Sequence, residues 1–273
     1  MRRFVHALCV SLALWLPAAQ PAAASAQTDA LLDLLGVTEM IEIMREEGIG
    51  YTDDLARDML GGTSAAWDSN VAKIYDTRAM VLLAQGGFAK AMEGVDLAPL
   101  TEFFTSPAGK RLVQLEISTR RAMLDEDIEA AAEERATELE AARDPRFDQI
   151  SALIDAGDML EANVVSALNS NILFYEGLVD GGAFKLSEAE ILTDVWSQEE
   201  VTRTDTRAWL YAFFLMAYAP LSVDEIDTFL TLSQTDEGRA LTRAIFAAYD
   251  GMYADISYAL GLAVAQEMQA EDI

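Results

Sequence analysis

The chain has 273 residues, of which 52% are hydrophobic, and it carries a net charge of −27. This apolar content, with few Pro and Gly, is typical of a folded protein and excludes a disordered one. A charge this negative is repelled by nucleic acid and by anionic lipid headgroups. It indicates a well-solvated surface, and it leaves a basic partner or a cation-rich setting as the alternative.

Residues 1–26 have the pattern of a signal peptide. Arg2 and Arg3 supply positive charge, residues 7–16 form an apolar run, and Ala24-Ser25-Ala26 matches the small-x-small cleavage pattern. The apolar run is too short for a bilayer, which needs about 20 residues. We therefore expect cleavage after Ala26, a periplasmic location and no transmembrane anchor.

The only Cys and the only His of the chain both lie in this segment, as Cys9 and His6. Beyond residue 26 the chain can therefore form no disulfide, Cys/His zinc site, His-ligated haem site, Ser-His-Asp triad or Cys-His dyad. The acidic clusters lack the ligand spacing of an EF-hand loop. We expect no metal site and no cofactor.

After the signal segment the apolar pattern is helical, and alternating strand patterns are missing. Gly48 and Gly50 are expected to end the first helix. Three glycine pairs predict further breaks between helices, at residues 61–62, 86–87 and 181–182. The fold class predicted is an all-α multi-helix bundle.

Two helix starts are marked by hydroxyl residues. Ser106 is a predicted N-cap followed by Pro at the first helical position, and Thr235 is the corresponding cap. Gly109 and Gly238 follow three residues after their caps, where they could let another helix pack closely. An apolar stretch precedes each cap, so we expect two helical hairpins. Anion binding at these helix starts is a weaker alternative, because the caps already satisfy the free amides.

Three later segments have clear patterns. Residues 123–143 are dense in Glu, Asp, Arg and Ala and predict a solvated helix that ends before Pro145. Residues 209–219 are apolar and aromatic and predict a buried helix. A stripe at helical spacing predicts a last helix packed on the core: Phe246, Tyr249, Tyr253, Ile256 and Leu260.

A four-residue sequence, Asp-Thr-Arg-Ala, occurs at 76–79 and again at 205–208. Four further identities fall on the same offset: Trp67 with Trp196, Gly109 with Gly238, Leu112 with Leu241, and Met123 with Met252. The collinearity indicates a module used twice. We expect helical module 1 at residues 27–128, a charged helical linker at 129–148 and helical module 2 at 149–273, with the two modules packed together.

The segment Leu97 to Leu115 has a distinctive core, Phe103-Phe104-Thr105-Ser106-Pro107-Ala108-Gly109-Lys110. It resembles the signature of domain of unknown function 2059, a family of bacterial secreted helical domains. Residues 221–268 resemble a second, diverged copy, in which Arg239 stands where the first has Lys110. The resemblance implies an all-helical exported protein and implies no activity.

The repeated polar residues Asp76, Arg78, Asp205 and Arg207 are the candidates for a ligand cleft. Residues two apart on a helix point to different faces, so neither Asp should pair with its own Arg. Each group is therefore expected to reach a neighbouring helix in a half-buried ion pair. The alternative is a polar site between the modules, in which a carboxylate could act as general base.

The sequence favours a non-enzymatic periplasmic binding or interaction protein, with an envelope protein or an apolar small ligand as partner. The aromatic residues of 209–216 and 246–258 could line such an apolar pocket, or simply form core. Two alternatives stay open: an enzyme that uses carboxylates and Arg in the cleft between the modules, and a structural or chaperone-like envelope protein.

Overall fold

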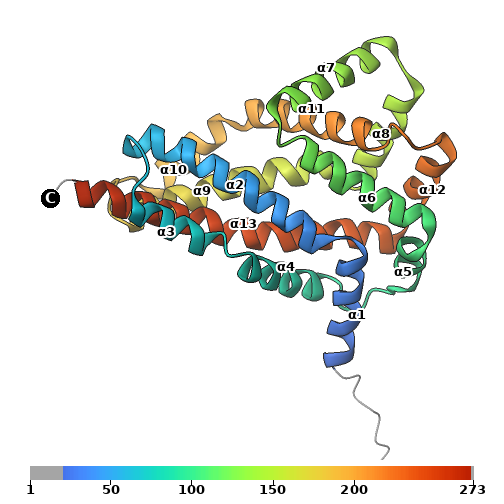
Figure 1. The fold of residues 1–273 in the computed structure, drawn as a ribbon, viewed down its shortest axis with the longest axis horizontal. Coiled ribbons are helices and arrows are strands. Elements are labelled where there is room, and N and C mark those ends of the chain that lie inside the picture. Colours follow the sequence, from blue (N-terminus) through green and yellow to red (C-terminus); the bar gives the residue numbers. More distant parts are fainter. Residues whose placement is uncertain (1–20, 272–273) are drawn as a thin grey trace, which may run out of the picture.

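The computed structural model of the protein describes residues 21–271 (Figure 1). Within that range the chain forms helices and no strand, which confirms the predicted all-α bundle. Residues 1–20, which hold the charged and apolar parts of the predicted signal peptide, lie outside the described range. In chain order the helices are α1 (Pro21–Leu34), α2 (Val37–Leu60), α3 (Ala65–Ile74), α4 (Thr77–Ala91), α5 (Ala98–Thr105), α6 (Pro107–Ala122), α7 (Glu126–Ala142), α8 (Pro145–Ala156), α9 (Met159–Asp180), α10 (Glu188–Ser197), α11 (Glu199–Ala217), α12 (Val223–Ser233) and α13 (Asp236–Glu271).

Helix α13 is the axis of the bundle. It has 36 residues and runs along the length of the molecule (Figure 1). It packs most extensively on α9 and α4 and also contacts α2, α3, α5 and α12. Elements from both predicted modules therefore assemble around one helix.

Helices α9 and α13 meet backbone to backbone. A Cβ atom on Gly261 would lie 2.1 Å from the carbonyl oxygen of Phe174, and one on Gly177 would lie 2.3 Å from the carbonyl oxygen of Tyr258. Both distances are far below van der Waals contact, so only glycine fits at these two positions. The two glycines thus set how closely α9 and α13, the pair of helices with the most extensive contact, approach each other.

Two of the predicted glycine breaks are confirmed. Gly61 adopts a left-handed conformation with φ 70° and caps α2. Gly181 follows the last residue of α9, and Gly182 turns the chain with φ 85°. These are the positions where a helix C-terminus favours glycine.

The other glycine predictions were wrong, because these four glycines lie inside helices, where two of them, Gly48 and Gly87, make room for a neighbour. Gly48 and Gly50 lie inside α2, and Gly48 lies against the ring of Tyr75. The pair at 86–87 lies inside α4, where a Cβ on Gly87 would be 3.0 Å from the Cα of Ala248 in α13. A glycine can end a helix, or it can lie inside a helix and make room for a neighbouring element. The periodicity of the sequence alone does not distinguish these two roles.

Both predicted N-caps form. The Ser106 hydroxyl accepts a hydrogen bond from the Gly109 N–H at 3.1 Å, and the Thr235 hydroxyl accepts one from the Gly238 N–H at 3.0 Å. In the first hairpin the cap joins α5 to α6, and in the second it joins α12 to α13. The two corners are therefore built alike.

The glycine of each corner faces the preceding helix. A Cβ on Gly109 would lie 2.2 Å from the carbonyl oxygen of Phe103, and one on Gly238 would lie 2.0 Å from that of Leu232. The two hairpins also touch, because the rings of Phe103 and Phe229 stack at 5.7 Å between centroids. The shared offset of 129 residues thus corresponds to a shared local geometry.

The predicted charged helix is displaced at its start. Helix α6 continues to Ala122, and α7 begins only at Glu126, where the side chain of Asp125 accepts hydrogen bonds from two backbone N–H groups. Arg143 ends α7 in a left-handed conformation with φ 53°. Ala136 is the buried residue of α7, as expected for a solvated helix.

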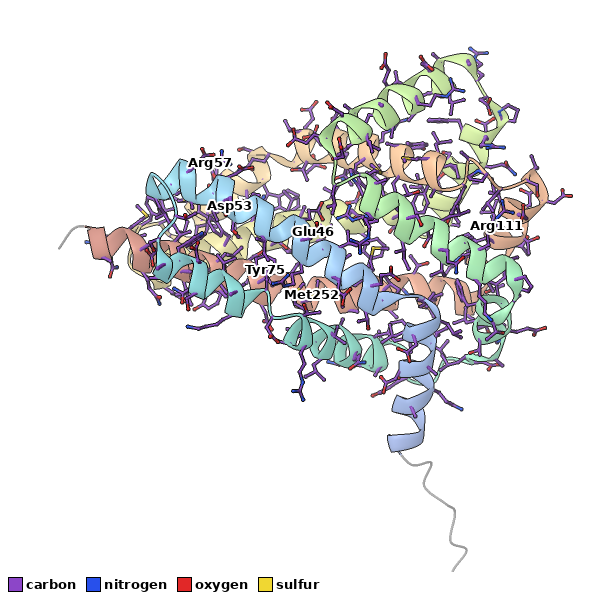
Figure 2. All side chains as sticks on the ribbon, viewed as in Figure 1. Glu46, Asp53, Arg57, Tyr75, Arg111 and Met252 are labelled. Carbon is purple, nitrogen blue, oxygen red and sulfur yellow. The ribbon has the colours of Figure 1, made fainter. Side chains whose placement is uncertain are left out.

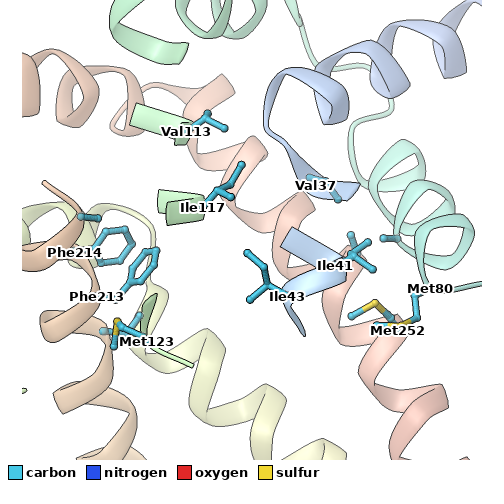
Figure 3. Close-up of a cluster of buried hydrophobic side chains, with 14 of the residues drawn as sticks. Val37, Ile41, Ile43, Met80, Val113, Ile117, Met123, Phe213, Phe214 and Met252 are labelled. Carbon is cyan, nitrogen blue, oxygen red and sulfur yellow. The ribbon is translucent and has the colours of Figure 1, made fainter. Parts of the chain in front are cut away.

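A single large hydrophobic cluster contains residues of both predicted modules, from Leu31 to Val264. Figure 3 shows Met252 of α13 beside Met80 of α4 and Ile41 of α2. Of the repeated pairs, the Leu and Met partners are buried alike, whereas Trp67 is 1% exposed and Trp196 is 58% exposed. The limits of the two modules stay a prediction.

We expect Gly261→Ala to lower the free energy of unfolding by about 1–3 kcal/mol, because the added methyl group forces α9 and α13 apart. The matched control is Gly251→Ala in the same helix, where a Cβ meets nothing within 4 Å. That control should be more stable than the natural chain by about 0.5–1 kcal/mol. Urea unfolding followed by circular dichroism measures both, and equal effects at the two positions would contradict the packing argument.

Candidate functional site

The two repeated aspartates occupy different places in the helices. Asp76 is the N-cap of α4, where its carboxylate accepts a hydrogen bond from the Ala79 N–H at 2.8 Å. Asp205 lies in the interior of α11 and is exposed. The same four residues therefore begin a helix in one copy and continue a helix in the other.

Arg207 makes the kind of inter-helix ion pair that the sequence predicted. Its guanidinium lies 2.7 Å from the carboxylate of Glu140 in α7 and 4.6 Å from the ring centroid of Tyr211. Arg207 thereby fastens the charged helix α7 to α11. Arg78 is exposed on α4.

The four candidates are not joined to one another. Within residues 21–271, no hydrogen bond or ion pair links Asp76 or Arg78 to Asp205 or Arg207. A ligand-cleft role for them stays a prediction. The surface grooves described below are lined by other residues.

The interior holds a polar pair that sequence reasoning missed. The hydroxyl of Tyr218, at the end of α11, donates a hydrogen bond to the carboxyl group of Glu116 in α6, and Tyr218 is fully buried. Burial raises the pKa of Glu116 to about 7, although the hydrogen bond from Tyr218 lowers it. The signal was present in the sequence, because Glu116 lies on the helical stripe of Leu112, Thr119 and Met123.

A second polar group lies one helical turn further along α6. Arg120 forms an ion pair with Glu47 of α2, and its guanidinium lies 4.7 Å from the ring centroid of Trp209 in α11. Burial raises the pKa of Tyr253 in α13 to about 12. The charges of Arg120, which lowers this pKa, and of Glu47, which raises it, also act on the Tyr253 hydroxyl. Long polar and aromatic side chains from α2, α6, α11 and α13 thus meet inside the bundle.

This interior cluster is suited to hold helices together. A buried charge is costly unless it is paired: Arg120 is paired with Glu47, and burial raises the pKa of Glu116 to about 7, which favours its protonated form. None of its members lines the two surface grooves. We therefore regard it as a structural feature.

Two surface grooves lie along α9 and share the residue Ile172. The first, the α9–α13 groove, has a volume of about 440 Å³, and the second, the α9–α10 groove, has about 290 Å³. The α9–α13 groove is lined by Ser166, Asn169, Ser170, Ile172, Leu173, Asp250, Gly251 and Ala254. The α9–α10 groove is lined by Ile172, Glu176, Val179, Asp180, Leu186, Glu188, Ile191 and Leu192.

The two grooves differ in chemistry. In the α9–α13 groove the polar groups are mostly uncharged, and the single carboxylate, Asp250, accepts a hydrogen bond from the Ser166 hydroxyl at 2.5 Å. Gly251 leaves its floor open. The α9–α10 groove combines three carboxylates with five aliphatic side chains. Ile172 lines both, so the two grooves adjoin at this residue of α9.

Sequence reasoning did not find these grooves. The available signal was a set of small polar residues three and four apart within the apolar helix α9, namely Ser166, Asn169 and Ser170. Such spacing marks one face of a helix. It does not say whether that face meets solvent, another helix or a partner.

Part of the chain matches a known family. Residues 78–138 match the family model described as an uncharacterized protein conserved in bacteria, DUF2059. This confirms the resemblance read from the first hairpin and extends it from α4 to α7. No curated protein and no solved structure matches the chain. A second copy in residues 221–268 stays a prediction.

Among residues 21–271 no helix is both long and apolar enough to cross a membrane. In the same range no three His, Cys, Asp or Glu side chains are arranged to hold a metal ion.

We expect the stability of the protein to fall as pH rises from the ordinary pKa of Glu to about 7, and to level off above it, because the raised pKa of Glu116 favours the protonated folded state. This contribution is fully present below the ordinary pKa of Glu and is lost as pH rises through the folded pKa. The loss between pH 5 and 8 should reach up to about 3 kcal/mol. Urea unfolding at several pH values measures it.

Glu116→Gln is the control, because a neutral amide at this position does not titrate. Its unfolding free energy should change less between pH 5 and 8 than that of the natural chain. Glu102→Gln, on the neighbouring exposed α5 surface, should retain the natural pH dependence. Identical pH profiles for the Glu116 variant and the natural chain would show that this carboxyl group is not the titrating one.

Proposed function

We propose that the protein is an exported, non-enzymatic binding protein that holds an elongated partner along α9. The observation that carries the proposal is that the two grooves adjoin at Ile172, which lines both. Their α9 residues run from Ser166 to Asp180, which spans about 20 Å at the rise of an α-helix. A surface of this length suits a chain-like partner better than a compact metabolite.

The way in which the fold holds the walls of the grooves favours binding. Their common wall, α9, is held on α13 by the Gly177–Gly261 contact, so one side of the site is rigid. A rigid surface loses little conformational freedom when it binds, and this favours affinity. Gly251 and Ala254 keep side-chain bulk out of the first groove.

The chemistry of the grooves favours a role without catalysis. They contain hydroxyl, amide and carboxylate groups, and the chain beyond residue 26 has no imidazole or thiol to activate a nucleophile. Among residues 21–271 two carboxyl groups have a raised pKa, and both lie outside the grooves: Glu116 in the interior cluster and Glu129 on α7. The signal-like pattern of residues 1–26 supports an exported location, where the partner would be met.

We expect Gly251→Trp to block the α9–α13 groove without unfolding the protein, because the position is exposed and open. Native mass spectrometry of the protein purified from the compartment to which it is exported should show a bound partner, and the variant should lack it. Gly86→Trp on α4, also exposed and open, is the matched control and should keep the partner. A partner retained by the Gly251 variant, or no partner in the natural protein, would overturn the proposal.

A further inference from the structure

The α9–α10 groove carries a concentrated negative charge over an apolar floor. Glu176, Asp180 and Glu188 line it together with five aliphatic side chains, and no Lys or Arg is among its lining residues. Glu176 and Glu188 are exposed. Within residues 21–271 none of the three forms an ion pair, and Asp180 only accepts a hydrogen bond from the Tyr258 hydroxyl at 2.8 Å.

Some exposed carboxylates elsewhere on the molecule have a cation partner. Glu225 lies 2.9 Å from Arg111 near the α6 and α12 corner, where Figure 2 places Arg111, and Glu161 lies 2.8 Å from Arg203. Around the α9–α10 groove the sequence from 176 to 194 contains a single cation, Lys185, which is exposed in the loop before α10. The lining residues of this groove include no cation that balances its charge, and a cationic partner would supply one.

The two walls of the groove differ in how firmly they are held. α9 is fixed on α13, whereas α10 rests on α9 through a small separate cluster: Val164, Leu168, Ile191 and Val195. One hydrogen bond, from the Tyr175 hydroxyl to Asp194 at 2.7 Å, ties α10 to α9 from the side. Few buried contacts give an element low local stability, so α10 can adjust to an occupant.

We infer that the α9–α10 groove binds a cationic amphipathic helix of a protein partner, an inference that rests on the proposed function. The aliphatic floor, from Ile172 to Leu192, accepts the apolar face of that helix. The three carboxylates lie where the Lys or Arg side chains on its flanks would reach. This is helix-in-groove recognition, in which the apolar face supplies affinity and the charges supply selectivity and association rate.

The length of the site sets the kind of occupant. At Ile172 the groove adjoins the α9–α13 groove, whose lining has the single carboxylate Asp250, so an occupant of both grooves is elongated and its charge is concentrated at one end. A helix of about 14 residues is about 20 Å long, which equals the length of the α9 segment that lines the two grooves. The net charge of −27 assists the approach of a basic partner from a distance.

The test uses the full chain and a synthetic helical peptide of 18 residues, with Leu on one face and Lys on the other. Fluorescence anisotropy at low ionic strength measures the dissociation constant. The double variant Glu176→Gln with Glu188→Gln should bind about fivefold more weakly, because it removes two rim charges. Raising the salt concentration should reduce the difference.

The control double variant Glu42→Gln with Glu134→Gln changes the net charge equally at exposed positions on α2 and α7. It should bind the peptide as the natural chain does. If both double variants weaken binding alike, the peptide responds only to net charge, and the inference is wrong. A peptide with Glu in place of Lys should not bind.

An apolar variant separates this inference from the proposed function. Leu186→Asn should weaken peptide binding about fivefold, whereas Leu82→Asn on α4, also exposed, should not. If Leu186→Asn and Gly251→Trp weaken binding while the Glu176/Glu188 variant does not, the grooves bind but the cationic partner class is wrong. If none of these variants has an effect, the grooves are not a binding site and both proposals fail.

Discussion

The backbone contact between α9 and α13 is the constraint on which the rest of the structure depends. Gly177 and Gly261 allow the two helices to touch without intervening side chains. Helices normally pack 8–10 Å apart with side chains between them. Close contact here brings the remaining helices around a paired axis. The two grooves lie along α9, one where it meets α13 and the other where it meets α10.

Where helices stand further apart, larger side chains fill the space. Arg120, Trp209 and Tyr253 occupy the region between α2, α6, α11 and α13, and Glu116 joins them through Tyr218. A polar group in such a place is acceptable only when it is paired or neutral. The structure meets this condition with one ion pair and one protonated carboxyl group.

Local chemistry made much of the fold predictable. The helical content, the caps at Ser106 and Thr235 and the buried helix of residues 209–219 all follow from short-range patterns. Helix ends at glycine were less predictable, since Gly87 serves a contact with a helix far along the chain. Long-range contacts of this kind leave no mark in the neighbouring sequence.

The candidate site was harder to predict for the same reason. Identical tetrapeptides suggested equivalent positions, yet Asp76 caps α4 while Asp205 lies within α11. The residues before Asp76 end a helix at Ile74, whereas the helix that contains Asp205 starts at Glu199. A groove also depends on which helix face stays uncovered, and that is decided by three-dimensional packing.

The protonated state of Glu116 has a consequence for the energetics of folding. Near pH 6 this carboxyl group is mostly ionised in the unfolded chain and mostly protonated in the folded one. Each molecule therefore takes up about one proton as it folds. The buffer releases that proton, so the heat of folding includes the ionisation heat of the buffer. Calorimetry in a phosphate buffer and in an amine buffer would then report different enthalpies for the same unfolding transition.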